Sequence, residues 1–160
     1  MKLLDLTLPS PAENLACDEA LLDTAEAGTD DEVLRFWEPL ELFVAVGYAN
    51  KVAAEVNAAA CVARGIPVLR RCSGGGPVVQ GPGCLNYTLV LRIAADGPLH
   101  NIGVANQFIM RQNRAAIESA IRNPQLQCVA TPISPSATAS FPATPSAAGN
   151  ISCSFTERFC

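Results

Sequence analysis

Residues 70–83 read RRCSGGGPVVQGPG, and this glycine-rich stretch decides how the whole sequence is interpreted. It lies between two segments with strand-like patterns, so we expect a loop that joins two β-strands. Three successive glycines let the backbone approach a ligand closely and present several N–H donors to it. Arg70 and Arg71 at its start can neutralise a phosphate or a carboxylate. The stretch therefore suits a nucleotide or an acyl-adenylate, and an ordinary hairpin turn with surface arginines is the alternative.

Two common phosphate-binding motifs are excluded for this loop. No Lys-Ser or Lys-Thr pair follows the glycines, as a Walker loop requires, and the glycine spacing does not match G-x-G-x-x-G. His100 is the only histidine, so neither a Ser-His-Asp triad nor a zinc site has support. We interpret Cys84 as a small buried residue and Cys72 as a packing residue, because no histidine lies near either thiol in the sequence.

The composition indicates one ordinary domain at the start of a 160-residue chain. Hydrophobic residues make up 49%, charged residues 16%, and the net charge is −4, which argues against a nucleic-acid binder and an acidic disordered chain. No apolar run approaches the about 18 residues of a membrane span. An acidic residue at position 5 argues against a signal peptide, so we expect a cytoplasmic protein. Seven irregularly spaced cysteines without a C-x-x-C pair favour reduced thiols.

Hydrophobic periodicity predicts strands and helices without a regular βαβ repeat, which favours an α+β fold around a mostly antiparallel sheet. A capping box at residues 10–13 (SPAE) marks the start of the first helix. The expected strands cover residues 3–8, 33–37, 42–47, 67–70 and 85–93, and the expected helices cover residues 13–27, 52–64 and 103–122.

The first helix has a predicted apolar side made of Leu15, Ala16, Ala20, Leu21 and Leu22.

On the same helix we expect Asp18 and Glu19 to be solvated or capping charges, because lone acidic residues on a helix are usually exposed. Phe36 and Trp37 in the following strand are predicted to belong to the core.

The glycine-rich stretch, together with residues 83–88 (GCLNYT), resembles the R-R-x-[ST]-G-G-G…L-x-Y-[ST] signature of the lipoate–protein ligase A family. This family belongs to the wider group of biotin and lipoate protein ligases and octanoyltransferases. Upstream segments resemble the family in order and spacing over about residues 1–122: NLACDEALL at 14–22, LRFWEP at 34–39, VGY at 46–48 and GIPV at 65–68. Gln80 departs from the family's usual histidine, and Asn50 from its usual glutamine.

The resemblance implies a fold similar to class II aminoacyl-tRNA synthetases and biotin ligases, with a mixed, mostly antiparallel sheet flanked by helices. It implies that ATP with Mg²⁺ activates lipoate, or octanoate, as an adenylate that then acylates a lysine. The implied acceptors are lipoyl carrier domains of 2-oxoacid dehydrogenase complexes or the glycine-cleavage H protein, with no nucleic-acid or membrane partner. The implied substrate- and ATP-binding residues are Arg70, Arg71, Ser73, Gly74, Gly75, Gly76, Pro77, Val78, Val79, Asn86 and Tyr87.

Within that set, the resemblance implies that Arg71 contacts a phosphate of ATP. Gly76 and the three residues after it would line the adenylate, and residues 73–75 would shape the loop around the lipoyl-phosphate junction. The family's catalytic lysine lies in a K-[FIV]-S-G-N/S-A-Q segment beyond the long helix. This sequence has no lysine after Lys51, so it offers no catalytic residue there.

The end of the chain has a different composition. From residue 130 to residue 148, all residues except Ile133 and Phe141 are Ala, Ser, Thr or Pro. Such a segment cannot bury enough apolar surface to offset its ordering entropy, which is typical of a flexible tail. We therefore divide the chain into a partial catalytic domain at residues 1–127 and a low-complexity, disordered or out-of-frame tail at residues 128–160.

The genetic code suggests why the lysine segment is missing. If the third base of each codon is joined to the first two bases of the next, residues 131–149 permit the peptide SDLAVGDRKFSGNAQRRR, which contains the family's lysine motif. We therefore predict a shift of reading frame near Gln127, by a sequencing error or by a disabling mutation. The coding DNA tests this prediction.

Three functions remain open at this point. The leading one is an ATP-dependent lipoate–protein ligase that is impaired in this chain because the lysine segment is missing. The first alternative is an octanoyltransferase of the same fold that uses octanoyl-acyl carrier protein. The second alternative is a non-catalytic protein that binds an acyl-adenylate or a nucleotide through residues 70–83.

Overall fold

The computed structural model describes residues 1–28, 32–93, 99 and 101–121, and helices and strands alternate irregularly along them. The helices in this part of the chain are α1 (Pro11–Glu26), α2 (Val52–Glu55), α3 (Ala58–Ala63) and α4 (Ile102–Ile121). The strands are β1 (Lys2–Asp5), β2 (Val33–Trp37), β3 (Phe43–Val46), β4 (Val68–Arg70), β5 (Val78–Gln80) and β6 (Asn86–Val90). The predicted α+β class is confirmed.

The strands form two small sheets of mixed direction. In the first sheet, ordered β1-β2-β6, β1 is parallel to β2 and β6 is antiparallel to it. In the second, ordered β4-β3-β5, β4 is parallel to β3 and β5 is antiparallel to it. The expected mixed sheet is therefore present as two sheets, in which the described pairs divide equally between the two directions.

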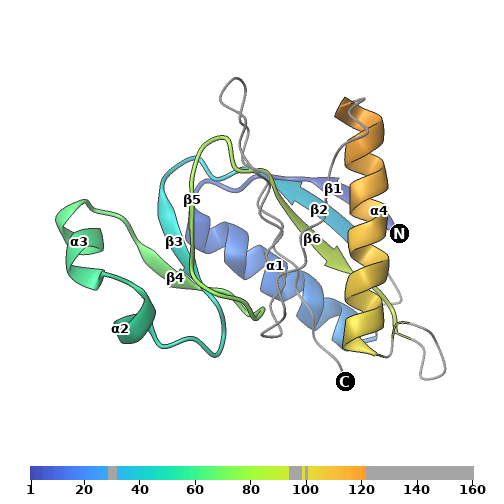
Figure 1. Cartoon of the computed structure of the whole chain (residues 1–160), viewed down its shortest axis with the longest axis horizontal. Helices are drawn as coiled ribbons and strands as arrows, with labels where there is room; N and C mark the ends of the chain where they lie inside the picture. Colours follow the sequence, from blue (N-terminus) through green and yellow to red (C-terminus); the bar gives the residue numbers. More distant parts are fainter. Residues whose placement is uncertain (29–31, 94–98, 100, 122–160) are drawn as a thin grey trace.

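Helices flank both sheets (Figure 1). α1 passes behind the strands, α4 stands beside the first sheet, and the segment with α2 and α3 projects from the second sheet. The start of α1 is the predicted capping box: the Ser10 hydroxyl accepts a hydrogen bond from the Glu13 amide at 3.2 Å, and the Glu13 carboxylate accepts one from the Ser10 amide at 2.9 Å. Local sequence alone thus sets where this helix begins.

A fully buried arginine joins α1 to the first sheet. The Arg35 guanidinium donates to the Leu6 carbonyl at 2.8 and 3.1 Å and to the Asn14 carbonyl at 2.9 Å. It also donates to the Asn14 side-chain oxygen at 2.6 Å and to the Asp18 carboxylate at 2.5 Å. The Trp37 indole N–H donates to the other Asp18 oxygen at 3.2 Å. Because the charged groups are paired and hydrogen-bonded, their burial is tolerated.

The prediction that Asp18 is a solvated or capping charge is wrong. Its side chain is buried against Arg35, and burial raises the pKa of the Asp18 carboxyl, while Thr88, Arg35 and Trp37 act in the opposite direction. Asn14 lies one turn before Asp18 on α1 and is also buried. The predicted apolar side of α1 is wrong in part for the same reason, because polar residues occupy its inner face and Ala16 and Ala20 are exposed.

Aromatic packing connects the two sheets. Trp37 of β2 stacks on Phe43 of β3, with ring centroids 6.4 Å apart and an interplanar angle of 28°. Ala45 completes this buried cluster, and Leu15 of α1 packs against its edge. Phe36, predicted to belong to the core, is only half-buried because its side chain points to the face opposite Trp37.

Other predicted elements differ from the structure at their ends. The first strand stops at Asp5, and the helix expected over residues 52–64 is interrupted at residues 56–57, where Val56 has extended backbone angles. β5 was not predicted, and Cys84 is half-buried instead of buried. Among the described residues, none of the helices has the length and apolar character needed to cross a bilayer. His100, the expected tail and the residues around the predicted frame shift lie outside the described residues.

We predict that Arg35→Met lowers the free energy of unfolding by about 3–5 kcal/mol, because it leaves the buried Asp18 carboxylate without its cation. Urea denaturation followed by the fluorescence of Trp37, the only tryptophan, measures the change. The matched control is Arg111→Met on the exposed side of α4, which should change stability by less than about 0.5 kcal/mol. Equal effects of the two substitutions would contradict the role given to Arg35.

Candidate functional site

The glycine-rich loop crosses the end of β3. Because β4 and β5 lie on opposite sides of β3, the chain between them must pass over the end of that strand. Backbone hydrogen bonds hold it there: the Arg71 amide donates to the Val46 carbonyl at 2.9 Å, and the Tyr48 amide donates to the Ser73 carbonyl at 2.9 Å. The loop is therefore attached to the turn that leaves β3, as well as to its own flanking strands.

Gly47 allows the two backbones to touch. A Cβ atom at this position would overlap the carbonyl oxygen of Gly75 and would lie 2.6 Å from the Asn50 side-chain oxygen. Gly75 itself has a φ of 101°, a backbone conformation that residues other than glycine rarely adopt. The third glycine, Gly76, has open space where a Cβ would lie. Gly47 is thus needed for close packing and Gly75 for its backbone conformation, whereas Gly76 has room for a side chain.

Arg71 binds two backbone carbonyls of the glycine-rich loop. Its guanidinium donates to the Gly74 carbonyl at 2.7 and 3.0 Å and to the Gly76 carbonyl at 3.0 Å. Burial lowers the pKa of Arg71, and the neighbouring Cys72 opposes that shift, but an arginine remains protonated near neutral pH. A positive charge therefore stays at the loop, where it would favour a bound anion.

The amides and the carbonyls of this loop differ in their hydrogen bonding. In the described part of the chain, the N–H groups of Gly74, Gly75 and Gly76 donate to no protein acceptor, whereas the carbonyls of residues 73, 74 and 76 all accept hydrogen bonds. Successive free amides of this kind form a concave site for an anion. Chemically, the loop can bind one phosphate or carboxylate group through its backbone.

Arg70 has a different position from Arg71. Its guanidinium donates to the carbonyls of Gly47, Tyr48 and Asn50 at 2.7, 2.8 and 3.0 Å. Both arginines therefore bind backbone carbonyls in this structure, and the phosphate contact of Arg71 stays a prediction.

The remaining candidate residues divide between the two sheets. Ser73 is buried in the loop, Pro77 and Val78 are half-buried beside it, and Val79 is exposed on β5. Asn86 and Tyr87 are buried on β6, in the other sheet, where the Tyr87 hydroxyl accepts a hydrogen bond from Asn113 at 2.6 Å.

The structure therefore brings residues 70–79 together and leaves the pair on β6 apart from them in the sheet order.

Two residues near the loop have roles that the sequence did not predict: Glu38, and Asn50, which was noted only for its departure from the family pattern. The Glu38 carboxylate accepts a hydrogen bond from the Gly83 amide at 2.6 Å and so fixes the far end of the glycine-rich stretch. Asn50 donates to the Glu55 carboxylate at 2.5 Å and closes the turn that Arg70 binds. Glu38 precedes the strand-ending Pro39, but no local pattern predicts a partner that lies 45 residues away.

No group of three or more His, Cys, Asp or Glu side chains in the described residues is placed to hold a metal ion.

The sequence matches the family model for the lipoyl protein ligase A/B catalytic domain over residues 10–122. A protein of Aeropyrum pernix named for lipoate-protein ligase A is 34% identical over 125 residues, which cover 76% of this chain and 45% of that protein. The octanoyltransferase LipM of Moorella thermoacetica is 30% identical over 108 residues, covering 68% of this chain and 38% of LipM. The chain spans less than half the length of these curated relatives.

Solved structures of archaeal proteins are similar as well. A bi-partite lipoate protein ligase of Thermoplasma acidophilum, described with its E2 lipoyl domain, matches 88% of this chain and 51% of its own with a TM-score of 0.62 and 28% identity. A T. acidophilum structure with bound lipoic acid matches 62% of this chain and 40% of its own with a TM-score of 0.52 and 31% identity.

We predict that Gly47→Ala lowers the free energy of unfolding by about 1–3 kcal/mol, because the new methyl group overlaps the Gly75 carbonyl. Gly76→Ala is the matched control, since its methyl group meets no atom within 4 Å and its φ is not positive. That variant should unfold within about 0.5 kcal/mol of the unsubstituted protein. Urea denaturation of both variants decides the point, and equal stabilities would rule out the close approach.

Proposed function

The chain belongs to the lipoyl protein ligase A/B catalytic domain family, and we propose that its glycine-rich loop binds the activated acyl group in the attachment of lipoate to a protein lysine. The observation that carries this proposal is the hydrogen bonding of the loop: the amides of Gly74–Gly76 donate to no acceptor in the described residues, whereas Arg71 binds the carbonyls of Gly74 and Gly76. This arrangement suits the single negative charge of an acyl-adenylate phosphate. The similar T. acidophilum structure with bound lipoic acid supports lipoate as the acid.

The proposed reaction has two balanced steps. A lipoate carboxylate oxygen attacks the α-phosphorus of ATP, the bond to the β-phosphate breaks, and pyrophosphate leaves. A lysine amine then attacks the acyl carbonyl carbon, an amide bond forms, AMP leaves, and the amine's proton passes to solvent. In both steps negative charge develops near the phosphate and the carbonyl, where oriented N–H donors act without reorganisation.

Three features of this chain would support those steps. The amides of Gly74–Gly76 would bind the phosphate oxygens, and Arg71 would keep the loop in shape and add positive charge. Glu38 would fix the exit of the loop through the Gly83 amide. Mg²⁺ bound to the phosphates of ATP would supply further positive charge in the first step.

We propose further that this chain forms little adenylate, because no lysine follows Lys51. A cation that bridged carboxylate and phosphate would lower the repulsion between the two reacting anions. The peptide SDLAVGDRKFSGNAQRRR, which the shifted frame permits, would supply such a cation. The acceptor lysine would lie on a carrier domain, as the E2 lipoyl domain described with the bi-partite T. acidophilum ligase suggests, or on the glycine-cleavage H protein.

Octanoyl transfer is the second candidate function, and the similarity to LipM octanoyltransferases supports it. In that reaction a thioester on acyl carrier protein would replace the adenylate as acyl donor. The same loop would then hold the carbonyl oxygen instead of a phosphate.

The 160-residue chain should bind a non-hydrolysable lipoyl-adenylate analogue in calorimetry. Arg71→Ala should weaken that binding about 10- to 100-fold, because the loop would lose the hydrogen bonds between Arg71 and its carbonyls and the positive charge near the phosphate. Hydrogen bonds to charged groups contribute about 1.5–3 kcal/mol. Arg111→Ala on α4 is the control and should bind as the unsubstituted chain does. Absence of heat from a folded sample would contradict the proposed site.

A protein in which residues 1–127 are followed by the shifted frame should form lipoyl-adenylate from lipoate and radiolabelled ATP. The 160-residue chain should form little. Replacement of the encoded lysine by methionine should abolish the gain, which separates an effect of the cation from an effect of a longer fold. Acylation of a carrier domain from octanoyl-acyl carrier protein, without ATP, would instead favour the octanoyltransferase. Comparable adenylate formation by the 160-residue chain would refute the proposed impairment.

A further inference from the structure

The segment between β3 and β4 is an apolar projection without a core of its own. We call residues 51–66 the α2–α3 lobe; eleven of its 16 residues are apolar. Neither of its helices has a buried residue, and Val62 on α3 is 81% exposed. Most of the other exposed residues of the two helices are alanines, so the lobe offers a largely apolar surface to a partner.

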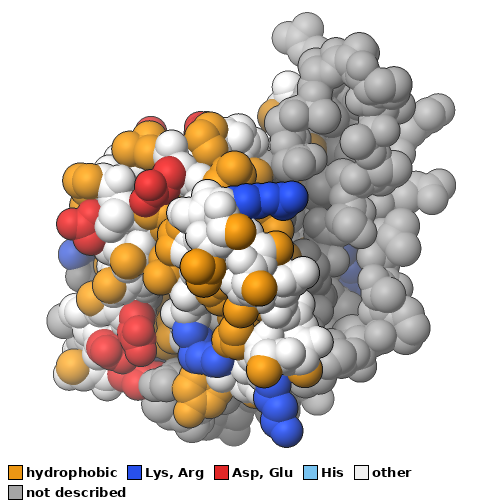
Figure 2. Space-filling view, turned by 90° about the vertical axis from the view of Figure 1, so that its left-hand side faces the viewer, with side chains coloured by type: hydrophobic (Ala, Val, Ile, Leu, Met, Phe, Trp, Pro, Cys, Tyr) orange, Lys and Arg blue, Asp and Glu red, His pale blue; other side chains and the backbone are white. Residues whose placement is uncertain are grey.

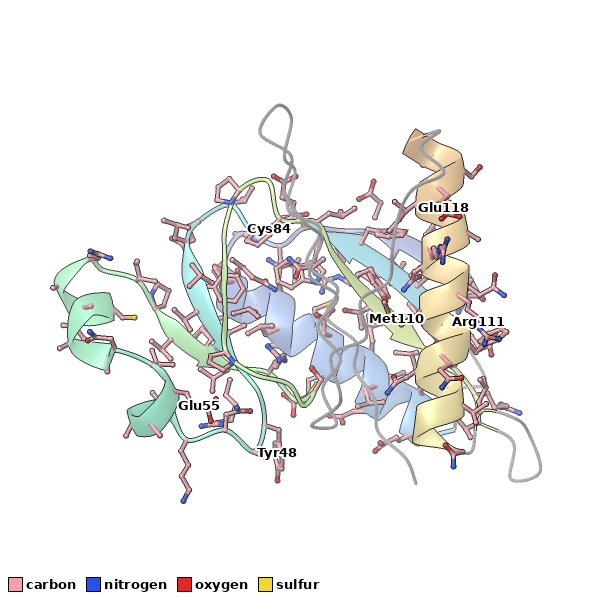
Figure 3. All side chains as sticks on the ribbon, viewed as in Figure 1. Tyr48, Glu55, Cys84, Met110, Arg111 and Glu118 are labelled. Atoms are coloured by element: carbon pink, nitrogen blue, oxygen red, sulfur yellow. The ribbon has the colours of Figure 1, made fainter. Side chains whose placement is uncertain are left out.

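The lobe is joined directly to the candidate site. Its base is the turn whose carbonyls bind Arg70, and the same turn contains Gly47, on which the glycine-rich loop packs. Tyr48 and Glu55 lie together at this base in Figure 3, and the exposed Tyr48 ring points away from the body of the protein. A protein that covered the lobe would therefore stand next to the loop amides.

The charge of this region is opposite to that of the chain as a whole. Residues 47–83 contain four basic residues and one acidic residue, whereas residues 1–46 contain eleven acidic residues and two basic ones, within a net charge of −4. Lys51 and Arg64 are exposed at the two ends of the lobe and form no ion pair in the described part of the chain. Figure 2 shows this face, with Lys and Arg side chains among hydrophobic ones at its centre and Asp and Glu side chains toward its left edge.

We propose that the α2–α3 lobe is the docking surface for the protein that receives the acyl group, and that this partner is a domain with an acidic surface around an apolar patch. The proposal rests on the proposed function, because it requires that acyl transfer take place at the adjacent loop. Acidic side chains would pair with Lys51 and Arg64, and apolar side chains would cover Val62 and its neighbours. A two-fold pair of copies would instead bring like charges of the two lobes together, which disfavours self-association here.

The test is a titration of an isotopically labelled E2 lipoyl domain with the 160-residue chain, followed by NMR. We expect Val62→Asp, and separately the double variant Lys51→Glu with Arg64→Glu, to weaken binding of the domain at least tenfold. Neither substitution should change the affinity for the lipoyl-adenylate analogue, since no hydrogen bond or ion pair in the described residues joins these side chains to the glycine-rich loop. For the unsubstituted chain, binding of the domain should weaken as salt is raised.

Matched controls lie on α4, which is on the other side of the molecule from the lobe in Figure 3. Val104→Asp and Arg111→Glu introduce the same changes at exposed positions, and both should leave binding of the lipoyl domain unchanged. Equal weakening by lobe and control variants would overturn the proposal. So would a chain that binds the analogue but not the lipoyl domain, or a dimer in sedimentation that Val62→Asp dissociates. Lobe-dependent docking without analogue binding would keep this proposal and reject the proposed loop function.

Discussion

The buried Arg35 guanidinium is the interaction on which the rest of the structure depends. An unpaired charge inside a protein is so unfavourable that its partners must all be present at once. Here the partners come from the turn before α1, through the Leu6 carbonyl, and from α1 itself, through Asn14 and Asp18. One side chain thus fixes the position of α1 on the first sheet.

The second sheet follows from this arrangement. Arg35 lies 5.5 Å from the centre of the Trp37 ring, and Trp37 stacks in turn on Phe43 at the start of β3. Gly47 follows the end of β3, and its lack of a side chain lets the Gly75 carbonyl of the glycine-rich loop pack against it. The position of the loop is therefore supported by a continuous series of contacts from the core outward. A site prepared in this way needs little reorganisation when an anion binds.

Local patterns predicted much of the fold. The capping box placed the start of α1, and alternation indicated β1 and β6, because both signals involve residues that are close in sequence. The short strand β5 was not predicted because it depends on pairing with β3, which is distant in sequence. The split between α2 and α3 was not predicted because apolar composition does not show that Val56 leaves the helical conformation. The role of Asp18 was missed because an acidic residue on a helix is usually exposed. Alternation did contain a usable signal: Arg35 lies between the inward-facing Val33 and Trp37, so a buried partner on α1 could have been sought.

For the candidate site, sequence identified the loop and its glycines but not their division of work. Only the structure separates Arg70, which binds the turn after β3, from Arg71, which binds the loop carbonyls. The most direct test of the account is the NMR spectrum of the labelled chain during titration with the lipoyl-adenylate analogue. The account predicts that the amide signals of Gly74, Gly75 and Gly76 shift most, while that of Gly65, beyond α3, stays in place. Saturable binding that leaves those three amides unshifted would contradict it.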